Sequence, residues 1–347
     1  MKAYQLVGWQ QPPELREVDV PEPGPGQVLL KVAGAGACHS DLHVMAAPAG
    51  YVPGELPFTL GHENTGWIEQ LGAGVADWEL GQPVAVYGPW GCGRCRPCRE
   101  SKENYCERQA ELGPLGGGLG TDGGMAEYML VPSGRLLVSL EGLDPIDAAP
   151  LTDAALTPYH AIKRSLHRLT PGTDVVCIGI GGLGHMAVQI LRALSAARII
   201  AVDIDSSKLA LASAHGADET VLADDDAMPH IRELTGGLGA ELVLDFVGSD
   251  ASMTLAAGVA RTEGEVTIVG VAGGTFEFRL GSLPYDCTIS LPYWGSAFEL
   301  AEVVALARRG QIKAQVERFP LEQVAVAYER LHDGKVDGRA VIVPHEG

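Results

Sequence analysis

Residues 175–203, VVCIGIGGLGHMAVQILRALSAARIIAVD, decide the fold class of this chain. Val175 to Ile180 is a β-branched, apolar run typical of a buried strand, and Leu183 to Leu194 has helical spacing without proline. Arg198 to Val202 is a second buried strand. A strand, a helix and a strand of these lengths predict a right-handed βαβ unit in a parallel sheet.

The turn between the first strand and the helix is rich in glycine. It has the pattern G-x-G-x-x-G, and Asp203 follows Gly179 by 24 residues (203 − 179). In this strand–turn–helix context the pattern is the dinucleotide-binding fingerprint, because the helix N-terminus offers free N–H groups to a pyrophosphate. A glycine-rich turn without a ligand is the alternative, and the stretch alone does not separate nicotinamide from flavin. The candidate contacts are Gly179, Gly181, Gly182, Leu183 and Gly184.

Asp203 predicts which nicotinamide cofactor is preferred. Its carboxylate can accept hydrogen bonds from both adenosine ribose hydroxyls, and it repels a 2′-phosphate. Asp205 adds negative charge, and no arginine stands between Asp203 and Lys208, a further candidate contact. The sequence therefore predicts NAD(H) rather than NADP(H).

Outside this stretch the chain divides into two parts of different character. Strands and helices keep alternating as far as about residue 270, which predicts a doubly wound sheet. The first 150 residues are rich in short strands and loops instead, including Val28 to Val32 and Val84 to Tyr87. Phe298 to Arg309 and Leu321 to Asp333 are expected helices, and Arg339 to Val343 is an expected strand that returns to the first domain.

Composition excludes several classes of function. The 347 residues are 46% hydrophobic and 20% charged, as in ordinary globular proteins, and 25 basic against 44 acidic residues give a net charge of −19. Without a cluster of Lys and Arg, we expect no nucleic-acid partner and no docking on an anionic membrane. We find no secretory signal at Met1 to Leu6 and no run of 18 apolar residues, and therefore expect a cytoplasmic protein.

Four of the seven cysteines lie within 15 residues, in the spacing Cys92-x2-Cys95-x2-Cys98-x7-Cys106. Such spacing is typical of a closed tetrahedral zinc site that leaves no position for substrate. An iron–sulfur cluster and four free thiols are the alternatives.

Two further segments carry residues suited to a catalytic metal. One is Cys38-His39-Ser40-Asp41-Leu42-His43, and the other is Gly61-His62-Glu63-Asn64-Thr65-Gly66, followed by Gly72, Gly74 and Val75. Each segment alone is a weak signal. Their occurrence in one chain with the four cysteines and the nucleotide fingerprint, in this order, is not a coincidence.

These motifs together resemble the zinc-dependent medium-chain alcohol dehydrogenases, essentially from end to end. Residues 87–92 (YGPWGC) and 149–154 (APLTDA) are most similar to bacterial NAD-dependent secondary-alcohol dehydrogenases and carbonyl reductases. The resemblance implies a Rossmann domain plus a β-rich GroES-like catalytic domain. The expected parts are 1–150 (catalytic), 151–285 (NAD-binding), and 286–347 (end of the nucleotide domain and return to the catalytic domain).

The resemblance also implies roles for individual residues. Cys38, His62 and Asp153 match the ligands of the catalytic zinc, so two zinc ions per chain are expected. Glu63 matches a carboxylate behind that zinc, and Asp41 matches the carboxylate that orients the ligand histidine. The remaining implied roles are Ser40 as the group that takes the alcohol's proton, His43 as the outer member of the relay, and His39 and Arg339 as pyrophosphate contacts.

Other interpretations of these residues stay open. Asp153 could be the N-cap of a helix that starts with Ala154, His43 a surface histidine, and Ser40 a turn residue. His160 is expected in the core. Cys177 is interpreted as a small buried hydrophobe.

The activity implied is reversible oxidation of alcohols, in particular secondary and aryl-substituted ones, to ketones or aldehydes. Tyr51, Phe58, Tyr293 and Trp294 are candidates for an apolar substrate pocket between the domains. The rivals are a zinc-free quinone or enone reductase of the same superfamily and a non-catalytic, zinc-stabilised nucleotide-binding protein. The expected partners are a small alcohol or ketone and further copies of the chain, in a dimer or tetramer.

Overall fold

The computed structural model describes residues 1–345, which form two compact units. The first unit contains residues 1–153, 296–308 and the chain from Ala314 onward, and the second contains residues 154–295 and 309–313. The chain thus leaves the first unit after Asp153 and returns to it at Ser296, whereas the sequence-based boundaries stand at 150 and 285.

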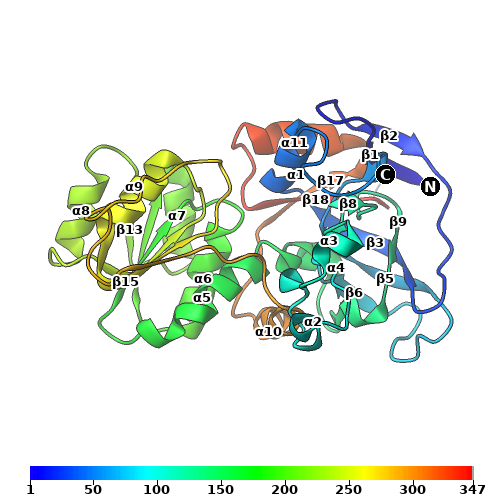
Figure 1. Cartoon of the computed structure of the whole chain (residues 1–347), viewed down its shortest axis with the longest axis horizontal. Helices are drawn as coiled ribbons and strands as arrows, with labels where there is room; N and C mark the ends of the chain where they lie inside the picture. Colours follow the sequence, from blue (N-terminus) through cyan, green and yellow to red (C-terminus); the bar gives the residue numbers. More distant parts are fainter. Residues whose placement is uncertain (346–347) are drawn as a thin grey trace. The chain divides into compact units, whose positions relative to one another are not determined.

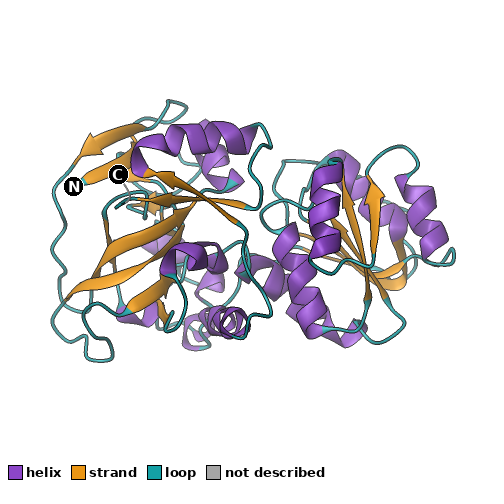
Figure 2. Ribbon diagram, turned by 180° about the vertical axis from the view of Figure 1, so that it is seen from behind, coloured by secondary structure: helices purple, strands orange, loops and turns teal. Residues whose placement is uncertain are grey.

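A sheet with helices around it forms the centre of the second unit (Figure 2). Its six strands are parallel and have the order β13-β12-β11-β14-β15-β16. This order reverses direction beside β11, as in a doubly wound nucleotide-binding fold. The strands are β11 (Asp174–Ile178), β12 (Arg198–Asp203), β13 (Glu219–Leu222), β14 (Ala240–Asp245), β15 (Ala260–Ile268) and β16 (Thr288–Ser290).

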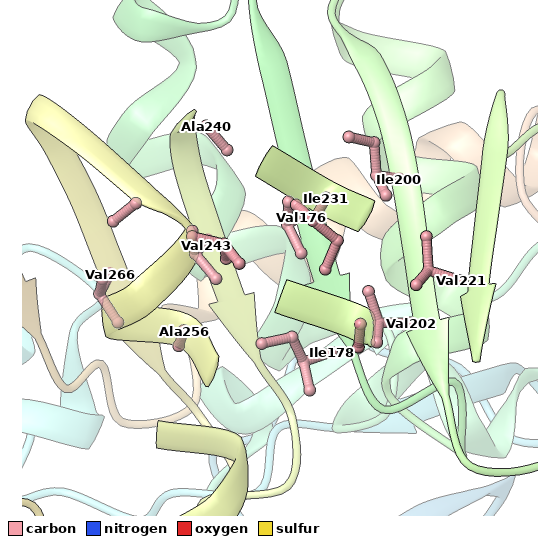
Figure 3. Packing of buried hydrophobic residues seen from close by; sticks show 13 residues of the cluster. Val176, Ile178, Ile200, Val202, Val221, Ile231, Ala240, Val243, Ala256 and Val266 are labelled. Carbon is pink, nitrogen blue, oxygen red and sulfur yellow. The ribbon is translucent and has the colours of Figure 1, made fainter. Parts of the chain in front are cut away.

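Helices cover both faces of this sheet. Val176 and Ile178 point into a cluster that also takes in Ile231 of α8 and Ala256 of α9 (Figure 3). Neighbouring side chains of a strand point to opposite faces, so Cys177 faces the side where α6 packs on β11. The helices are α5 (Leu156–Ser165), α6 (Gly184–Leu194), α7 (Ser206–Ala214), α8 (Ala227–Leu234) and α9 (Asp250–Val259).

The first unit is built mainly on antiparallel strands (Figure 1). Its main sheet has the order β10-β6-β5-β3-β18-β17, with β9 also paired to β3, and β17 runs parallel to β18. A second sheet has the order β2-β1-β4, and β7 pairs with β8. The strands are β1 (Lys2–Leu6), β2 (Glu14–Glu17), β3 (Val28–Gly36), β4 (Phe58–Thr59), β5 (Glu63–Leu71), β6 (Pro83–Val86), β7 (Gly116–Gly117), β8 (Gly120–Thr121), β9 (Tyr128–Val131), β10 (Leu137–Ser139), β17 (Val316–Pro320) and β18 (Arg339–Val343).

Short helices connect these strands. None of the helices in the described chain has the length and apolar character needed to cross a membrane. The α-helices of the first unit are α1 (His39–Ala46), α2 (Arg96–Arg99), α3 (Gln109–Leu112), α4 (Pro145–Ala148), α10 (Ala297–Arg308) and α11 (Val324–His332). The 3-10 helices of the chain are η1 (Glu103–Tyr105), η2 (Gly134–Leu136), η3 (Ala149–Thr152), η4 (Leu166–Arg168) and η5 (Leu321–Gln323).

Three neighbouring strands bring distant parts of the chain to one place. β3 lies between β5 and β18, and Gly36 at its end pairs with Glu63 on one side and Val341 on the other. Cys38 follows the end of β3, and Arg339 begins β18. The register therefore gathers Cys38, Glu63 and Arg339 at the same edge of the sheet.

Candidate metal centres and nucleotide loop

Four potential metal ligands meet at this edge of the sheet: Cys38, His62, Glu63 and Asp153 have ligand atoms within 4.8 Å of one another. Oδ2 of Asp153 lies 3.8 Å from Sγ of Cys38 and 3.7 Å from Nε2 of His62. All four residues are at least nine-tenths buried.

The donor set and the spacing fit zinc. Zinc binds thiolate, imidazole and carboxylate at about 2.0–2.3 Å, so tetrahedral ligands lie roughly 3.3–3.8 Å apart. The separations at Asp153 agree with that range. Thiolate and carboxylate ligands buried together would need a compensating positive charge, which a divalent ion supplies.

Asp41 fixes the orientation of the histidine. Its Oδ1 lies 2.8 Å from Nδ1 of His62, and its Oδ2 accepts a hydrogen bond from the backbone N–H of Cys38 at 2.9 Å. Asp41 is completely buried at the start of α1. The pKa of His62 is raised well above its ordinary value: burial alone would lower it, but Asp41, Asp153 and Cys38 outweigh burial. The contact leaves Nε2 facing the cluster, which is the orientation a metal ligand requires.

Arg339 forms a buried ion pair with Glu63. Its Nε donates to Oε2 of Glu63 at 2.9 Å, its Nη2 donates to the other oxygen, and Nη2 lies 3.6 Å from Oδ2 of Asp153. Burial raises the pKa of Glu63 to about 7, and the Arg339 guanidinium opposes this shift. The guanidinium is only 2% exposed and faces Glu63 and Asp153, so in this structure it supplies one positive charge to the ligand cluster; its contact with pyrophosphate stays a prediction.

The geometry at Asp153 argues against the helix-cap interpretation. Asp153 ends the 3-10 helix η3, and the residue at the N-cap of α5 is Ala155. Because the carboxylate faces Cys38 and His62, it is placed as a ligand would be.

The proposed proton-transfer residues lie on α1. The hydroxyl of Ser40 lies 3.6 Å from Sγ of Cys38, at the rim of the cluster. His43 is half-buried and stands three residues further on, so the two share a face of the helix. His39, the first residue of α1, is exposed.

The four cysteines of the other motif also converge. Sγ of Cys95 lies 3.3 Å from Sγ of Cys98 and 4.0 Å from that of Cys106, and Sγ of Cys92 lies 3.9 Å from that of Cys98. Zn–S bonds of about 2.3 Å in a tetrahedron separate sulfurs by about 3.8 Å. Backbone N–H groups of Arg94 and Cys95 lower the pKa of the Cys92 thiol to about 6. These four residues would therefore hold a closed structural zinc.

A buried ion pair supports this cysteine lobe. Glu103 is 5% exposed and pairs with Arg135, whose Nη2 also donates to the backbone oxygen of Gly91 at 2.6 Å. Gly91 has no room for a side chain, because a Cβ there would lie 2.6 Å from Sγ of Cys98.

The glycine loop has the geometry that a dinucleotide requires. Gly179 has a φ of +87°, and a Cβ on Gly184 would lie 1.9 Å from the backbone oxygen of Gly179, so both positions need glycine. Gly181 is exposed, and a Cβ there would meet no atom within 4 Å, which leaves an open approach to the N-terminus of α6.

Asp203 braces this loop from the end of β12. Its Oδ2 accepts from the N–H of Ile180 at 2.6 Å, and its Oδ1 accepts from the N–H of Asp205 at 3.0 Å. A carboxylate has about four acceptor positions, so two stay available for ribose hydroxyls. Lys208 lies half-buried on α7, whose N-cap is Asp205.

The aromatic candidates for a substrate pocket belong to both units. In the first unit Tyr51 is 60% exposed, whereas Phe58 is buried and its ring packs 6.4 Å from that of Trp9. In the second unit Tyr293 and Trp294 make an edge contact at 6.0 Å, and Trp294 has a φ of +57°. Their common pocket stays a prediction.

Sequence reasoning missed several supporting contacts. The Glu63–Arg339 pair joins residues 276 positions apart, and the Glu103–Arg135 pair is 32 positions apart. No local pattern reports such pairings. Elsewhere, His160 is buried on α5, and burial raises the pKa of Cys177 to about 12, as expected for an unreactive core thiol.

A Rossmann unit, a GroES-like unit and two zinc-compatible ligand groups define a zinc-binding dehydrogenase. Residues 24–141 match the model of the alcohol dehydrogenase GroES-like domain, and residues 182–307 match that of the zinc-binding dehydrogenases. The chain belongs to the zinc-containing medium-chain alcohol dehydrogenase family and is an enzyme, which confirms the expected family and fold class. The expected cofactors, NAD(H) and two zinc ions per chain, are those of this family and agree with the two ligand groups.

The relatives are similar along their whole length. D-arabinose 1-dehydrogenase (NADP(+)) of Saccharolobus solfataricus is 37% identical, over 99% of this chain and 97% of that protein. NAD-dependent alcohol dehydrogenase of Sulfurisphaera tokodaii is 35% identical, over 99% and 100%.

Solved structures agree with these sequence relatives. The alcohol dehydrogenase of Aeropyrum pernix has a TM-score of 0.92 at 36% identity, covering 99% of this chain and all of the other (100%). Acetophenone reductase of Geotrichum candidum, solved with NAD, has a TM-score of 0.85 at 33% identity, covering 99% and 97%.

Proposed function

We propose that this enzyme catalyses the zinc-dependent, reversible oxidation of secondary alcohols, including aryl-substituted ones, to ketones, with NAD as hydride acceptor. The observation that carries the proposal is the convergence of Cys38, His62 and Asp153, with the hydroxyl of Ser40 3.6 Å from the cysteine sulfur. Three ligands of this kind leave the fourth position of a catalytic zinc open to substrate.

Each residue of the cluster has a distinct task in this proposal. Cys38, His62 and Asp153 would hold the zinc, which supplies Lewis-acid polarisation of the alcohol or carbonyl oxygen. The Ser40 hydroxyl accepts the alcohol's proton and passes it towards His43, which lies on the same face of α1. Arg339 holds Glu63 in a buried ion pair, so that Asp153 serves as the third ligand.

The nucleotide loop supports NAD(H) as the preferred cofactor. The amides at the start of α6 would take the pyrophosphate. The carboxylate of Asp203 is 7% exposed at the end of β12, and a 2′-phosphate placed beside it would be repelled. Lys208 is the first basic residue after Asp203 and is proposed as a further contact.

Aromatic residues support the choice of bulky secondary alcohols. Tyr51, Phe58, Tyr293 and Trp294 are proposed as the aromatic residues that a bulky substrate would contact. Trp294 is buried and keeps a left-handed backbone, which is uncommon outside glycine and concentrates at functional sites. A relative that reduces acetophenone, an aryl ketone, agrees with this choice.

One experiment tests the proposal and separates its rivals. Zinc content is measured on the purified chain, and NADH consumption is followed with acetophenone, an aliphatic ketone, benzaldehyde and a benzoquinone, with D-arabinose and NADP⁺ in the reverse direction. We expect two zinc per chain and turnover of ketones with NADH. Quinone reduction with one zinc or none would favour the zinc-free reductase, and no turnover of any substrate would favour a binding protein. Preferential oxidation of D-arabinose with NADP⁺ would instead indicate a sugar dehydrogenase, like the related D-arabinose 1-dehydrogenase.

We further propose that the enzyme is a homo-oligomer, a dimer or tetramer, joined through residues 271–293 of the second unit. Within the described residues, β16 pairs only with β15 and leaves one backbone edge open. Residues 271–293, which contain β16, carry six large exposed apolar side chains: Val271, Phe278, Leu280, Tyr285, Leu291 and Tyr293, exposed by 60%, 75%, 95%, 81%, 76% and 41%.

Area and charge both favour a second copy as the partner. At roughly 150 Å² for each large side chain, these six expose roughly 600–700 Å², close to what one partner contributes to a stable interface. Residues 271–293 carry two acidic groups and one basic group, a net of −1 of the chain's −19. Copies of an acidic chain repel one another least where both are nearly neutral.

Leu280→Glu and Leu291→Glu test the interface against Leu238→Glu, a control at a leucine of the same unit that is 63% exposed. Sedimentation velocity should show dissociation with the first two variants and an intact oligomer with the third. A wild-type monomer, or three variants that behave alike, would contradict the proposed interface.

A cytoplasmic location is proposed alongside, supported by the absence of disulfides among the described cysteines.

A further inference from the structure

His185 is a histidine at the start of α6, directly after the glycine loop, and it is completely buried. Nδ1 of its ring lies 3.0 Å from the backbone oxygen of Gly181, one helical turn earlier in the chain. The same oxygen accepts a hydrogen bond from the backbone N–H of His185 at 3.1 Å. A carbonyl oxygen has two lone pairs, so this one residue occupies both acceptor positions of Gly181.

The contact fixes which ring nitrogen of His185 carries a proton. A carbonyl oxygen can only accept a hydrogen bond, so Nδ1 is a donor whether the ring is neutral or charged. The ring also packs against the C-terminal end of α7, because its centroid lies 6.1 Å from that of His215, the C-cap residue of that helix. The imidazole is thus held by contacts with both α7 and the glycine loop.

The peptide between Gly181 and Gly182 has little else to hold it. Glycine has no Cβ to confine its backbone, so a peptide between two glycines can turn at low cost. A Cβ at Gly181 would meet no atom within 4 Å, so packing does not confine this position either. Within residues 1–345, the N–H of Gly182 donates no hydrogen bond to the chain. The two hydrogen bonds from His185 to the Gly181 oxygen therefore determine how this peptide is oriented.

Orienting this peptide also orients an amide that is suited to binding phosphate. The C=O of Gly181 and the N–H of Gly182 belong to one planar, trans peptide, so they point in opposite directions. Because the oxygen is turned towards α6, the N–H is turned away from the helix, as in the helix N-termini that bind anions. Gly181 is exposed and Gly182 is half-buried, which leaves this amide accessible to a ligand.

We propose that His185 is a positioning residue for the cofactor, whose Nδ1–H fixes the Gly181–Gly182 peptide so that the N–H of Gly182 is presented to the pyrophosphate. His185 acts through the backbone and does not touch the cofactor. The proposal rests on the nucleotide contacts of the proposed function, because it requires the dinucleotide to bind at the start of α6. It gives a task to a residue just outside the G-x-G-x-x-G pattern.

The test separates the donor from the bulk of the side chain. His185→Asn keeps a donor in place, because Nδ2 of asparagine and Nδ1 of histidine are both bonded to Cγ. His185→Leu and His185→Met fill the space with apolar groups that cannot donate, and the more adaptable methionine carries the comparison if the leucine variant does not fold. Dissociation constants are measured for NADH by fluorescence titration, and for ADP-ribose and adenosine by competition with NADH.

Binding of the pyrophosphate should follow the donor. From the contribution of one neutral hydrogen bond, we expect NADH and ADP-ribose to bind about 3–10-fold more weakly to His185→Leu and His185→Met. Both ligands should bind to His185→Asn within about twofold of the wild-type affinity, because the hydrogen bond is retained.

Adenosine and His215→Leu are the controls. Adenosine lacks the pyrophosphate, so its affinity should be the same in every variant. His215→Leu removes the neighbouring ring and leaves both donors on the Gly181 oxygen, so it should bind all three ligands like the wild-type enzyme.

A packing role for His185 would give a different pattern. Equal loss of NADH affinity in His185→Asn and His185→Leu, or a parallel loss of adenosine affinity, would overturn the proposal. Wild-type affinity for NADH in the variants without a donor would overturn it as well. Failure of the proposed function has its own signature, because the wild-type enzyme itself would then not bind NADH or ADP-ribose.

Discussion

Asp153 supplies one of the negative charges that balance the zinc ion in the proposed catalytic site. Asp153→Asn keeps the shape of the side chain but replaces an anionic ligand by a neutral amide, which binds zinc poorly. We expect about one of the two zinc ions to be lost, together with most of the activity. Metal analysis after dialysis and steady-state kinetics check this. Asp153→Cys should keep both ions, since a thiolate restores charge and donor.

Asp147→Asn is the matched control for Asp153. Asp147 is a carboxylate of the same region, 41% exposed and bonded at 2.7 Å to Arg318, so its loss should change neither zinc content nor turnover. Two zinc ions and near-normal turnover in Asp153→Asn would instead make Glu63 the leading third ligand.

Asp203 should determine the choice between NAD and NADP. Asp203→Ser removes the negative charge and keeps a hydroxyl for the ribose. The free-energy preference for NAD over NADP should therefore fall by about one to a few kcal/mol, and each 1.4 kcal/mol lowers the ratio of the two kcat/KM values about tenfold. Asp205→Asn is the comparison, because it removes a charge two residues away and retains a side chain that can cap α7; it should change the cofactor preference less than Asp203→Ser does. Equal kcat/KM values for the two cofactors in the wild-type enzyme would remove the argument.

Local sequence was sufficient for the residues that meet through short segments. Cys38, His62 and the four clustered cysteines stand in motifs, and the structure brings each set together. The partner of Arg339 could not be found in this way, because a strand from the end of the chain delivers it to Glu63. Its burial in a metal cluster depends on sheet register.

The zinc of the cysteine lobe should contribute to the stability of the fold rather than to the catalytic rate. Cys98→Ser opens the closed site, and because structural zinc contributes folding free energy, the melting temperature should fall while the remaining folded enzyme keeps activity. Cys287→Ser is the control for zinc content: Cys287 is half-buried in the second unit and belongs to neither ligand group among the described residues, so this variant should keep both zinc ions. Scanning calorimetry and zinc analysis of the same samples check this. An unchanged melting temperature in a variant that has lost this zinc would contradict the role.

Elements with a strong hydrophobic pattern were predictable, and peripheral ones were not. The sequence predicts β11 and β12 to within one or two residues because their side chains are buried on both faces. β13 escaped prediction because, at the edge of the sheet, only Val221 of its four residues is buried. α8 follows three aspartates and contains Pro229, so its helical pattern is weak in the sequence.

At the scale of the whole molecule, charge and oligomer should respond together to salt. A chain of net charge −19 repels its copies, and salt screens that repulsion while leaving apolar contacts intact. Raising NaCl from about 20 mM to about 500 mM should therefore strengthen association, as measured by the concentration dependence of sedimentation. An interface built from ion pairs would weaken instead, and that outcome would contradict the assignment to residues 271–293.

The pairing of β18 with β3 has a consequence for the order of events during synthesis. The main sheet of the first unit joins Val28 to Val343, so on the ribosome it cannot be completed before β18 has been synthesised. The six strands of the second unit are complete by Ser290 and can assemble earlier. Until β18 emerges, Glu63 lacks its guanidinium partner and the edge of β3 stays open. The nascent protein thus passes through a stage with a formed nucleotide unit and an unfinished metal centre.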